Sequence, residues 1–268
     1  MPPLKHISVS SLRTFQRCAA QWEFSYCDGW KKPANLNFAI GLAVDAGVNL
    51  ALREKRDTGK LPEREKIIAE TESWWQSNEV ELWPDESRKD AVAMSITLAA
   101  IMYDELLPHI KPAPGRQSIQ EKFLVELIPG VPSILAFMDV IAEDGIHDIK
   151  TSATRYNEKK VAHDLQRQVY GLIYMLETDT KEVQFTFDVG VKLKKPVLQS
   201  ISMPVTEADA EYVLGWIEKT FGQIASSMKS GHFPPNRESF LCSRRNCQYW
   251  RECEKRHGGV VHEGSEKR

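Results

Sequence analysis

The sequence lacks the features that mark membrane, secreted and repeat proteins. Its longest apolar run, residues 91–103, is too short to cross a bilayer and is interrupted by Ser95 and Thr97, so it indicates a buried helix. Residues 1–10 have no signal-peptide core, and there is no internal repeat or low-complexity block. These absences lead us to expect a cytoplasmic globular protein without a membrane partner.

The chain also lacks an excess of positive charge. Its 35 Lys and Arg residues against 37 Asp and Glu give a formal net charge of −2. Nucleic-acid binders usually carry a basic face, so the total charge lends no support to such a partner, although a neutral protein can have a local basic groove. Its 268 residues are enough for one domain with an appended helical part.

Cysteine is scarce, and three of the five cysteines lie close together, at Cys242, Cys247 and Cys253. Cytosolic thiols stay reduced, so such a group favours metal or redox chemistry over disulfides. The segment is short and poor in apolar residues, so it needs a staple to hold its fold. Three thiolates are one short of a tetrahedral or cubane site, and only Cys18 and Cys27 can supply a fourth. Iron–sulfur and zinc both suit four cysteines.

The apolar pattern changes at residues 111–115, a linker with strong helix breakers. Helices are expected before it and a mixture of strands and helices after it. Expected helices span about 11–28, 38–56, one stretch holding 74–83, 86–110, 158–177 and 206–231, and expected strands span 119–128, 133–143, 146–151, 183–191 and 197–203. The second helix is apolar nearly all round and should be buried.

This order predicts a mixed α/β core with a helical N-terminal elaboration. We expect a single domain over residues 1–257. Its parts are a helical N-terminal part (1–115), an α/β core (116–230) and a cysteine-rich segment (231–257), followed by a frayed, disordered tail at 258–268.

Asp144–Gly145 is a strong hairpin-turn signal between two of the expected strands. A two-residue turn there pairs Glu143 with Ile146. Counting outward along both strands then places Asp139 opposite Lys150. This register predicts which polar side chains of the hairpin come together.

Asp139, Asp148 and Lys150 should project from one face of the hairpin, with Asp139 diagonal to Asp148. That face is otherwise apolar, as is the face of the preceding strand that carries Glu121. Buried carboxylates are costly unless a cation compensates, and hard oxygen ligands suit Mg²⁺ or Mn²⁺. A nearby lysine can orient a water or stabilise a pentavalent phosphate. The alternative is a surface hairpin with weak ion pairs.

Two further candidates lie on helices. Gln166 and Tyr170 are four residues apart and share a face, where they can clamp a phosphate or a strand end. The alternative is a surface pair with the tyrosine partly in the core. His147 points away from Asp148 along its strand, and we leave it out of the site.

Together these residues resemble the RecB-like family of PD-(D/E)xK nucleases, over nearly the whole chain. The family has an acidic residue on one strand, Asp/Glu-x-Lys on the next and Gln-x-x-x-Tyr on a helix. The matching segments here are Ala136-Phe-Met-Asp139, His147-Asp148-Ile-Lys150 and Gln166-Arg-Gln-Val-Tyr170. The resemblance is closest to CRISPR-associated and phage-type exonucleases with iron–sulfur clusters, and it implies a restriction-endonuclease-like mixed sheet flanked by helices.

The resemblance also implies roles for single residues. It makes Lys150 the catalytic lysine, places Glu121 where relatives often have an acidic residue, and implies as metal ligands Asp139, Asp148 and the backbone carbonyl of Ile149. Where the family has Gly-x-x-x-His, this chain has Gly41-Leu-Ala-Val-Asp45. A buried aspartate in an apolar helix is expensive without a partner, so Asp45 is interpreted as a substituted metal ligand. The alternatives are pairing with a lysine or a site that has lost activity.

For the cysteines, the resemblance favours Cys18 as the fourth ligand of a 4Fe–4S cluster beside Cys242, Cys247 and Cys253, with Cys27 unligated. The implied activity is a DNA exonuclease that uses Mg²⁺ or Mn²⁺ and acts on single-stranded DNA. Its context would be DNA repair, recombination, phage DNA processing or CRISPR adaptation, as a homo-oligomer or with a recombination or CRISPR protein. Two other hypotheses remain: a catalytically weakened DNA-binding module and a zinc-stapled interaction protein.

Overall fold

The computed structural model describes residues 4–115 and 117–264. The described residues form two compact units, which we treat one at a time. Unit 1 comprises the described residues of Met1–Lys32, Leu124–Leu135 and Glu211–Arg268, and unit 2 comprises those of Pro33–Phe123 and Ala136–Ala210.

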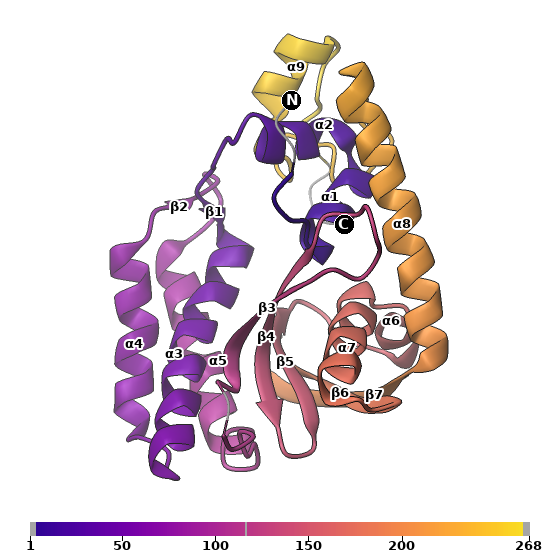
Figure 1. Ribbon diagram of the computed structural model, residues 1–268. Helices are drawn as coiled ribbons and strands as arrows, with labels where there is room; N and C mark the ends of the chain where they lie inside the picture. The colour runs from indigo at the N-terminus through magenta and orange to yellow at the C-terminus, as the bar shows by residue number, and fades with distance from the viewer. Residues whose placement is uncertain (1–3, 116, 265–268) are drawn as a thin grey trace. The chain divides into compact units, whose positions relative to one another are not determined.

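In unit 2, three helices pack on one another: α3 (Leu36–Thr58), α4 (Arg64–Ser77) and α5 (Arg88–Glu105) (Figure 1). The side chain of Asn35 caps α3 by accepting a hydrogen bond from a backbone N–H of its first turn. The helix ends at Gly59, whose φ of 76° lies in the left-handed region. The apolar sequence of α3 is thereby confined to one continuous helix.

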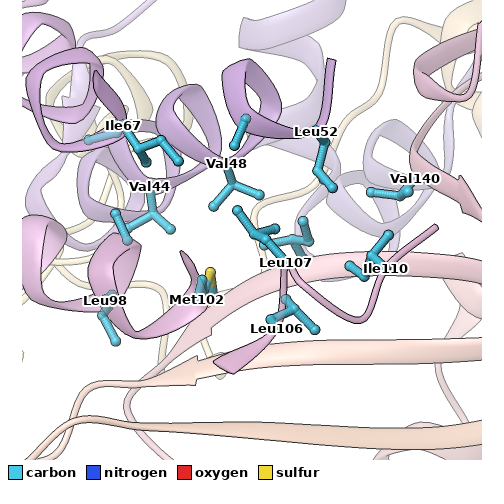
Figure 2. Close-up of a cluster of buried hydrophobic side chains, with 14 of the residues drawn as sticks. Val44, Val48, Leu52, Ile67, Leu98, Met102, Leu106, Leu107, Ile110 and Val140 are labelled. Carbon is cyan, nitrogen blue, oxygen red and sulfur yellow. The ribbon is translucent and has the colours of Figure 1, made fainter. Parts of the chain in front are cut away.

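The apolar side chains of these helices form one buried cluster (Figure 2). Its members include Val44, Val48 and Leu52 of α3, Ile67 of α4, and Leu98 and Met102 of α5. α3 is the one described helix that is long and apolar enough to cross a membrane, but half of its apolar window is buried inside the protein. The prediction of a buried second helix is confirmed, and its apolarity serves the core.

A five-stranded mixed sheet adjoins the helices, in the order β3-β4-β5-β6-β7. Pairing is antiparallel for β4 with β5 and for β6 with β7, and parallel for β5 with β6. The strands are β3 (Ile119–Val125), β4 (Ile134–Ala142), β5 (Gly145–Ser152), β6 (Glu182–Val191) and β7 (Val197–Thr206). All five predicted strands are confirmed. A two-stranded parallel sheet, β1 (Ala34–Asn35) with β2 (Val80–Glu81), was not predicted.

The crossover from β5 to β6 runs through α6 (Glu158–Ala162) and α7 (Leu165–Thr178), so the single predicted helix 158–177 is wrong. The break occurs because Asp164 caps α7, its Oδ1 accepting from the backbone N–H groups of Gln166 at 2.8 Å and Arg167 at 3.1 Å. α5 and α7 both pack on β6 and β7, so helices flank the sheet.

The predicted hairpin register is also wrong. Ile141 pairs with Ile146 and Val140 with His147, so the turn is at Glu143–Asp144. Gly145, with a φ of 134°, begins β5 instead of ending the turn. The error is two residues, and side chains two apart share a face, so the predicted face survives while Asp139 moves opposite Asp148.

Unit 1 begins with three short helical pieces in place of the one predicted. They are α1 (Val9–Arg17), α2 (Ala19–Trp22) and a π-helical turn (Glu23–Cys27). The break between α1 and α2 falls at Cys18, whose φ of −164° and ψ of 109° are extended.

In unit 2, the helical stretch predicted to hold 74–83 also divides, because α4 ends at Ser77 and residues 82–83 lie outside it.

The other end of the chain supplies the remaining helices of unit 1. α8 (Glu207–Ser230) ends where Gly231 takes a φ of 69°, as predicted, and its residues 211–230 belong to this unit. α9 (Trp250–His257) follows the cysteine-rich segment. Within the expected tail, Val261 is buried and its carbonyl accepts from Arg244 at 2.7 Å. Residues 265–268 of that tail lie outside the described residues.

One buried ion pair in unit 2 gives a test of how the fold is stabilised. Arg167 of α7 is 1% exposed and donates to Asp209 at 2.6 Å. We expect Asp209→Asn to lower the free energy of unfolding by about 2 kcal/mol, because it leaves a buried guanidinium without its counterion. Urea unfolding measures the loss. Asp104→Asn, which breaks the exposed pair with Arg64, is the matched control and should cost at most about 0.5 kcal/mol.

The same pair predicts a pH dependence. Burial raises the pKa of Asp209, but hydrogen bonds and the charge of Arg167 outweigh it and lower the pKa below its ordinary value. The stabilisation is therefore present above the unfolded pKa and lost as the pH falls through the folded one. The difference between wild type and Asp209→Asn should shrink below about pH 4. A difference that grows on acidification would contradict this assignment.

Candidate functional site

The polar side chains of β4 and β5 meet at one place in unit 2. The Nζ atom of Lys150 lies 2.5 Å from an oxygen of Asp148 and 4.0 Å from an oxygen of Asp139. The same oxygen of Asp139 accepts the backbone N–H of Ile149 at 2.9 Å. Antiparallel pairing of the two strands brings these groups together on one face, as the sequence predicted.

The site is buried, and its charges do not balance. Asp148 is fully buried, and burial raises its pKa to about 7 although the neighbouring Lys150 lowers it. Burial lowers the pKa of Lys150, but the carboxylates of Asp148 and Asp139 raise it above its ordinary value. The lysine therefore keeps its proton, and the surrounding negative charge exceeds what it neutralises.

α3 adds a third carboxylate to this cluster. Burial and the carboxylate of Asp139 raise the pKa of Asp45 to about 7, while the Asn49 side chain, Lys150 and Arg53 lower it. Asp45 is thus close enough to interact with both Asp139 and Lys150. Three carboxylates share one lysine, which is the charge pattern of a site that takes a divalent cation.

α7 contributes the predicted pair Gln166 and Tyr170. The Nε2 of Gln166 donates to Asp148 at 2.8 Å. Burial, with Asp148 and Asp139, raises the pKa of Tyr170 to about 12, and its hydroxyl is held by the backbone of Phe137. α7 approaches the sheet closely because Gly171 has no Cβ, which would collide with Val205 of β7.

On β3, the contact with the site comes from a residue that the sequence did not single out. Gln120 donates to Asp139 at 3.0 Å, and its φ of 53° places it in the left-handed region. No sequence signal announces a glutamine in that conformation. Glu121, the predicted residue, is the next position of β3 and is half-buried. Its part in the site stays a prediction.

The site face is more open than predicted at one position. Phe137, two residues before Asp139 on β4, is 44% exposed although an apolar, buried face was expected. His147, left out of the site on sequence grounds, lies elsewhere: its Nδ1 is 2.7 Å from a carboxylate oxygen of Asp188. The other oxygen of Asp188 accepts from Ser200 at 2.5 Å, so this histidine belongs to a separate buried network.

The cysteines of unit 1 are gathered as well. Cys18, Cys242, Cys247 and Cys253 line one largely apolar cavity together with the rings of Phe24, Tyr249 and Trp250. Burial raises the pKa of Cys247 to about 11, and the other three thiols contribute to the increase. Cys27 does not line this cavity. Extended backbone at Cys18 between α1 and α2 presents its thiol to the segment from the other chain end.

The four thiols line one cavity, but they are not arranged as closely as the ligands of a bound metal ion. Among residues 4–115 and 117–264, no group of three or more His, Cys, Asp or Glu side chains is arranged to hold a metal ion. This holds for the carboxylates around Lys150 as well as for the cysteines. The residue types and their gathering suit metals at both places.

Comparisons with known proteins agree with this geometry. Residues 6–254 match the profile of the PD-(D/E)XK nuclease superfamily. A solved structure from Eubacterium rectale, provisionally described as an exonuclease, is 18% identical, covers 98% of this chain and 91% of its own, and has a TM-score of 0.57. The structure of SSO0001 is 12% identical, with coverages of 86% and 91% and a TM-score of 0.33. No curated protein matches.

The first of these structures shows the same fold, and with the family match it confirms the predicted class. That class is a restriction-endonuclease-like mixed sheet flanked by helices.

The surplus of carboxylates predicts that a hard divalent cation stabilises the protein. We expect Mg²⁺ to raise the midpoint of thermal unfolding, with a gain of about 2.7 kcal/mol at a hundred times its dissociation constant. Mg²⁺ is chosen because it does not favour thiolates. In Asp139→Asn the increase should be largely lost, whereas Asp104→Asn should respond as the wild type does. Equal shifts in all three proteins would show that Mg²⁺ binds elsewhere.

Proposed function

Because the chain belongs to the PD-(D/E)XK nuclease superfamily, we propose that it is a metal-dependent exonuclease that degrades single-stranded DNA. The observation that carries this proposal is the meeting of Asp45, Asp139 and Asp148 around Lys150. Such a surplus of buried negative charge has no structural use, and a divalent cation relieves it.

Mg²⁺ or Mn²⁺ would be held by Asp45, Asp139, Asp148 and the carbonyl of Ile149. These are hard oxygen donors, which both ions prefer. When bound, the metal supplies a polarised phosphate and an attacking water of lowered pKa.

The residues of the chain do the rest. Since the pKa of Lys150 is raised, it acts as a fixed cation that stabilises charge developing on the phosphate, and not as a base. Tyr170, with a pKa of about 12, keeps its proton and donates a hydrogen bond to a phosphate oxygen. Gln166 holds Asp148 in place through its 2.8 Å hydrogen bond.

Two observations support the finer parts of the proposal. Phe137 offers an exposed ring beside Asp139, on which an unpaired base can stack, and this favours single-stranded DNA. The similar structure from Eubacterium rectale is described as an exonuclease, and we propose the same mode for this chain. The proposed context is DNA repair, recombination, phage DNA processing or CRISPR adaptation, with a homo-oligomeric or a recombination or CRISPR protein partner.

For unit 1 we propose a 4Fe–4S cluster on Cys18, Cys242, Cys247 and Cys253. The four thiols share an apolar cavity, and a cluster there would join segments near both chain ends. Hydrolysis needs no redox step, so the cluster would be structural. Zinc on the same cysteines is the competing occupant and would fit the interaction-protein hypothesis.

One observation favours a second function. Asp45 stands where the resemblance implies a histidine, and such a substitution is compatible with a catalytically weakened DNA-binding module. The carboxylates that remain around Lys150 favour the nuclease, because a binding module has no need of them.

Lys150→Ala tests the proposed activity. We expect the wild type, purified without oxygen, to degrade end-labelled single-stranded DNA with Mn²⁺, and the variant to be about 100- to 1000-fold slower because the stabilising cation is gone. Lys122→Ala, at an exposed position of β3, is the matched control. Equal rates for the two variants would exclude Lys150 from catalysis.

The same assay separates the two functions. A wild type that binds DNA without cutting it, together with an Asp45→His variant that cuts, would favour the binding module. Products released from one labelled end identify an exonuclease and its direction. Internal fragments at early times would contradict exonuclease action.

The cluster predicts a metal content. We expect about four iron and four sulfide per chain, as a 4Fe–4S cluster requires. Cys18→Ser should lose most of both and unfold at a lower temperature, while Cys27→Ser should keep them. Elemental analysis with acid-labile sulfide determination measures this. One zinc per chain without sulfide would replace the cluster by a zinc site, and iron retained in Cys18→Ser would contradict the assignment of the fourth ligand.

A further inference from the structure

α3 carries more than Asp45 on the side that meets the site. Asn49 and Arg53 follow Asp45 at intervals of four residues, so the three side chains share one face of the helix. The Asn49 side chain hydrogen-bonds to Asp45. A polar stripe therefore runs from the proposed metal site along α3.

The stripe leads into a surface groove of unit 2. Asn49, Leu50 and Arg53 line it on α3, with Lys66 and Glu70 on α4. Asn49 is 5% exposed, and its buried Oδ1 has no hydrogen-bond partner among the described residues. A buried acceptor without a partner is costly, so this groove is incomplete without a ligand or water.

The charges around Arg53 leave it available. Neighbouring cations are already paired: Arg56 with Asp57 at 2.7 Å, and Lys66 with Glu54 at 2.5 Å. Within residues 4–115 and 117–264, Arg53 forms no ion pair. Glu54 and Asp57, which also line the groove, are thus engaged by cations other than Arg53, and Glu70 of α4 is a third carboxylate of the lining.

We propose that Arg53 binds a backbone phosphate of the DNA strand that flanks the phosphate being cut. Arg53 lies eight residues beyond Asp45, about 12 Å along the helix, too far for the scissile phosphate and suitable for one further along the strand. The planar guanidinium matches phosphate oxygens in a two-pronged contact. The inference rests on the proposed function, because it assumes that DNA occupies the site.

Asn49 fits the same occupant. Its Oδ1 can only accept a hydrogen bond, so it does not contact the phosphate. A water carried with the strand supplies the donor. The groove then holds the DNA backbone by one charge contact and one neutral contact.

Binding is tested in a Lys150→Ala background, where the DNA stays intact. Fluorescence anisotropy measures the affinity for a labelled single-stranded oligonucleotide at several salt concentrations. Arg53→Gln should weaken binding about tenfold and reduce the slope of log affinity against log salt by about 0.7, the value for one lost phosphate contact on a single strand. Arg53→Lys should keep the slope.

Arg64→Gln is the matched control, since Arg64 lies on α4 and is paired with Asp104 at 3.1 Å. It should leave affinity and slope unchanged. With Lys150 restored, Arg53→Gln should raise KM about tenfold and leave kcat within about twofold, because a flanking contact binds substrate and transition state alike.

Several results would overturn the inference. They are an Arg53→Gln protein that behaves as Arg64→Gln does, an unchanged salt slope, or a loss confined to kcat, which would place Arg53 in the metal site through Asp45. Absence of salt-dependent binding by the Lys150→Ala protein would overturn it too. If the wild type cuts no DNA but Arg53→Gln still reduces the salt slope, the proposed nuclease activity is wrong and Arg53 remains a phosphate-binding residue.

Discussion

The excess of buried carboxylate around Lys150 is the constraint on which unit 2 depends. Asp148 is fully buried, and it remains so only because Lys150 and Gln166 contact it. These partners come from β5 and α7, while α3 brings Asp45 and β3 brings Gln120. With Asp139 of β4, five elements thus converge on a charge that no one of them can stabilise. The interaction explains why a mixed sheet with its parallel crossover is needed to build so small a site.

Much of this site was predictable, because a strand repeats every two residues. The hairpin register was wrong by two, yet Asp139, Asp148 and Lys150 still share a face. An error of one residue would have separated them. The buried α3 was predictable from its apolar composition, since its residues from Ala39 to Leu52 contribute to the core of unit 2. The two-residue periodicity of strands therefore identified the candidate site residues although the position of the turn was predicted wrongly.

What the sequence did not reveal depends on local backbone geometry. The break before α7 depends on a side chain accepting two backbone hydrogen bonds at Asp164, and that acceptor competes with a continuous apolar pattern. Gln120 reaches Asp139 through a left-handed backbone that residues other than glycine seldom adopt. Cys18 sits at an extended break inside an amphipathic pattern that reads as one helix. In each case one specific backbone conformation or side-chain hydrogen bond outweighs the average preference of the segment. The separation into two units, with β4 and α8 passing between them in sequence, likewise leaves no mark in composition.

Asp45 shows how the chain bears the cost of a buried aspartate in an apolar helix. A histidine at this position would be neutral and would add no charge to the carboxylates of Asp139 and Asp148. An aspartate adds one, and burial beside Asp139 raises its pKa to about 7. The same helix supplies the compensation, since Asn49 and Arg53, one and two turns of the stripe further on, both lower that pKa. A site with one more oxygen ligand favours a harder cation and tolerates softer metals less. The residues that lower the pKa of Asp45 are also those that extend the polar stripe into the groove.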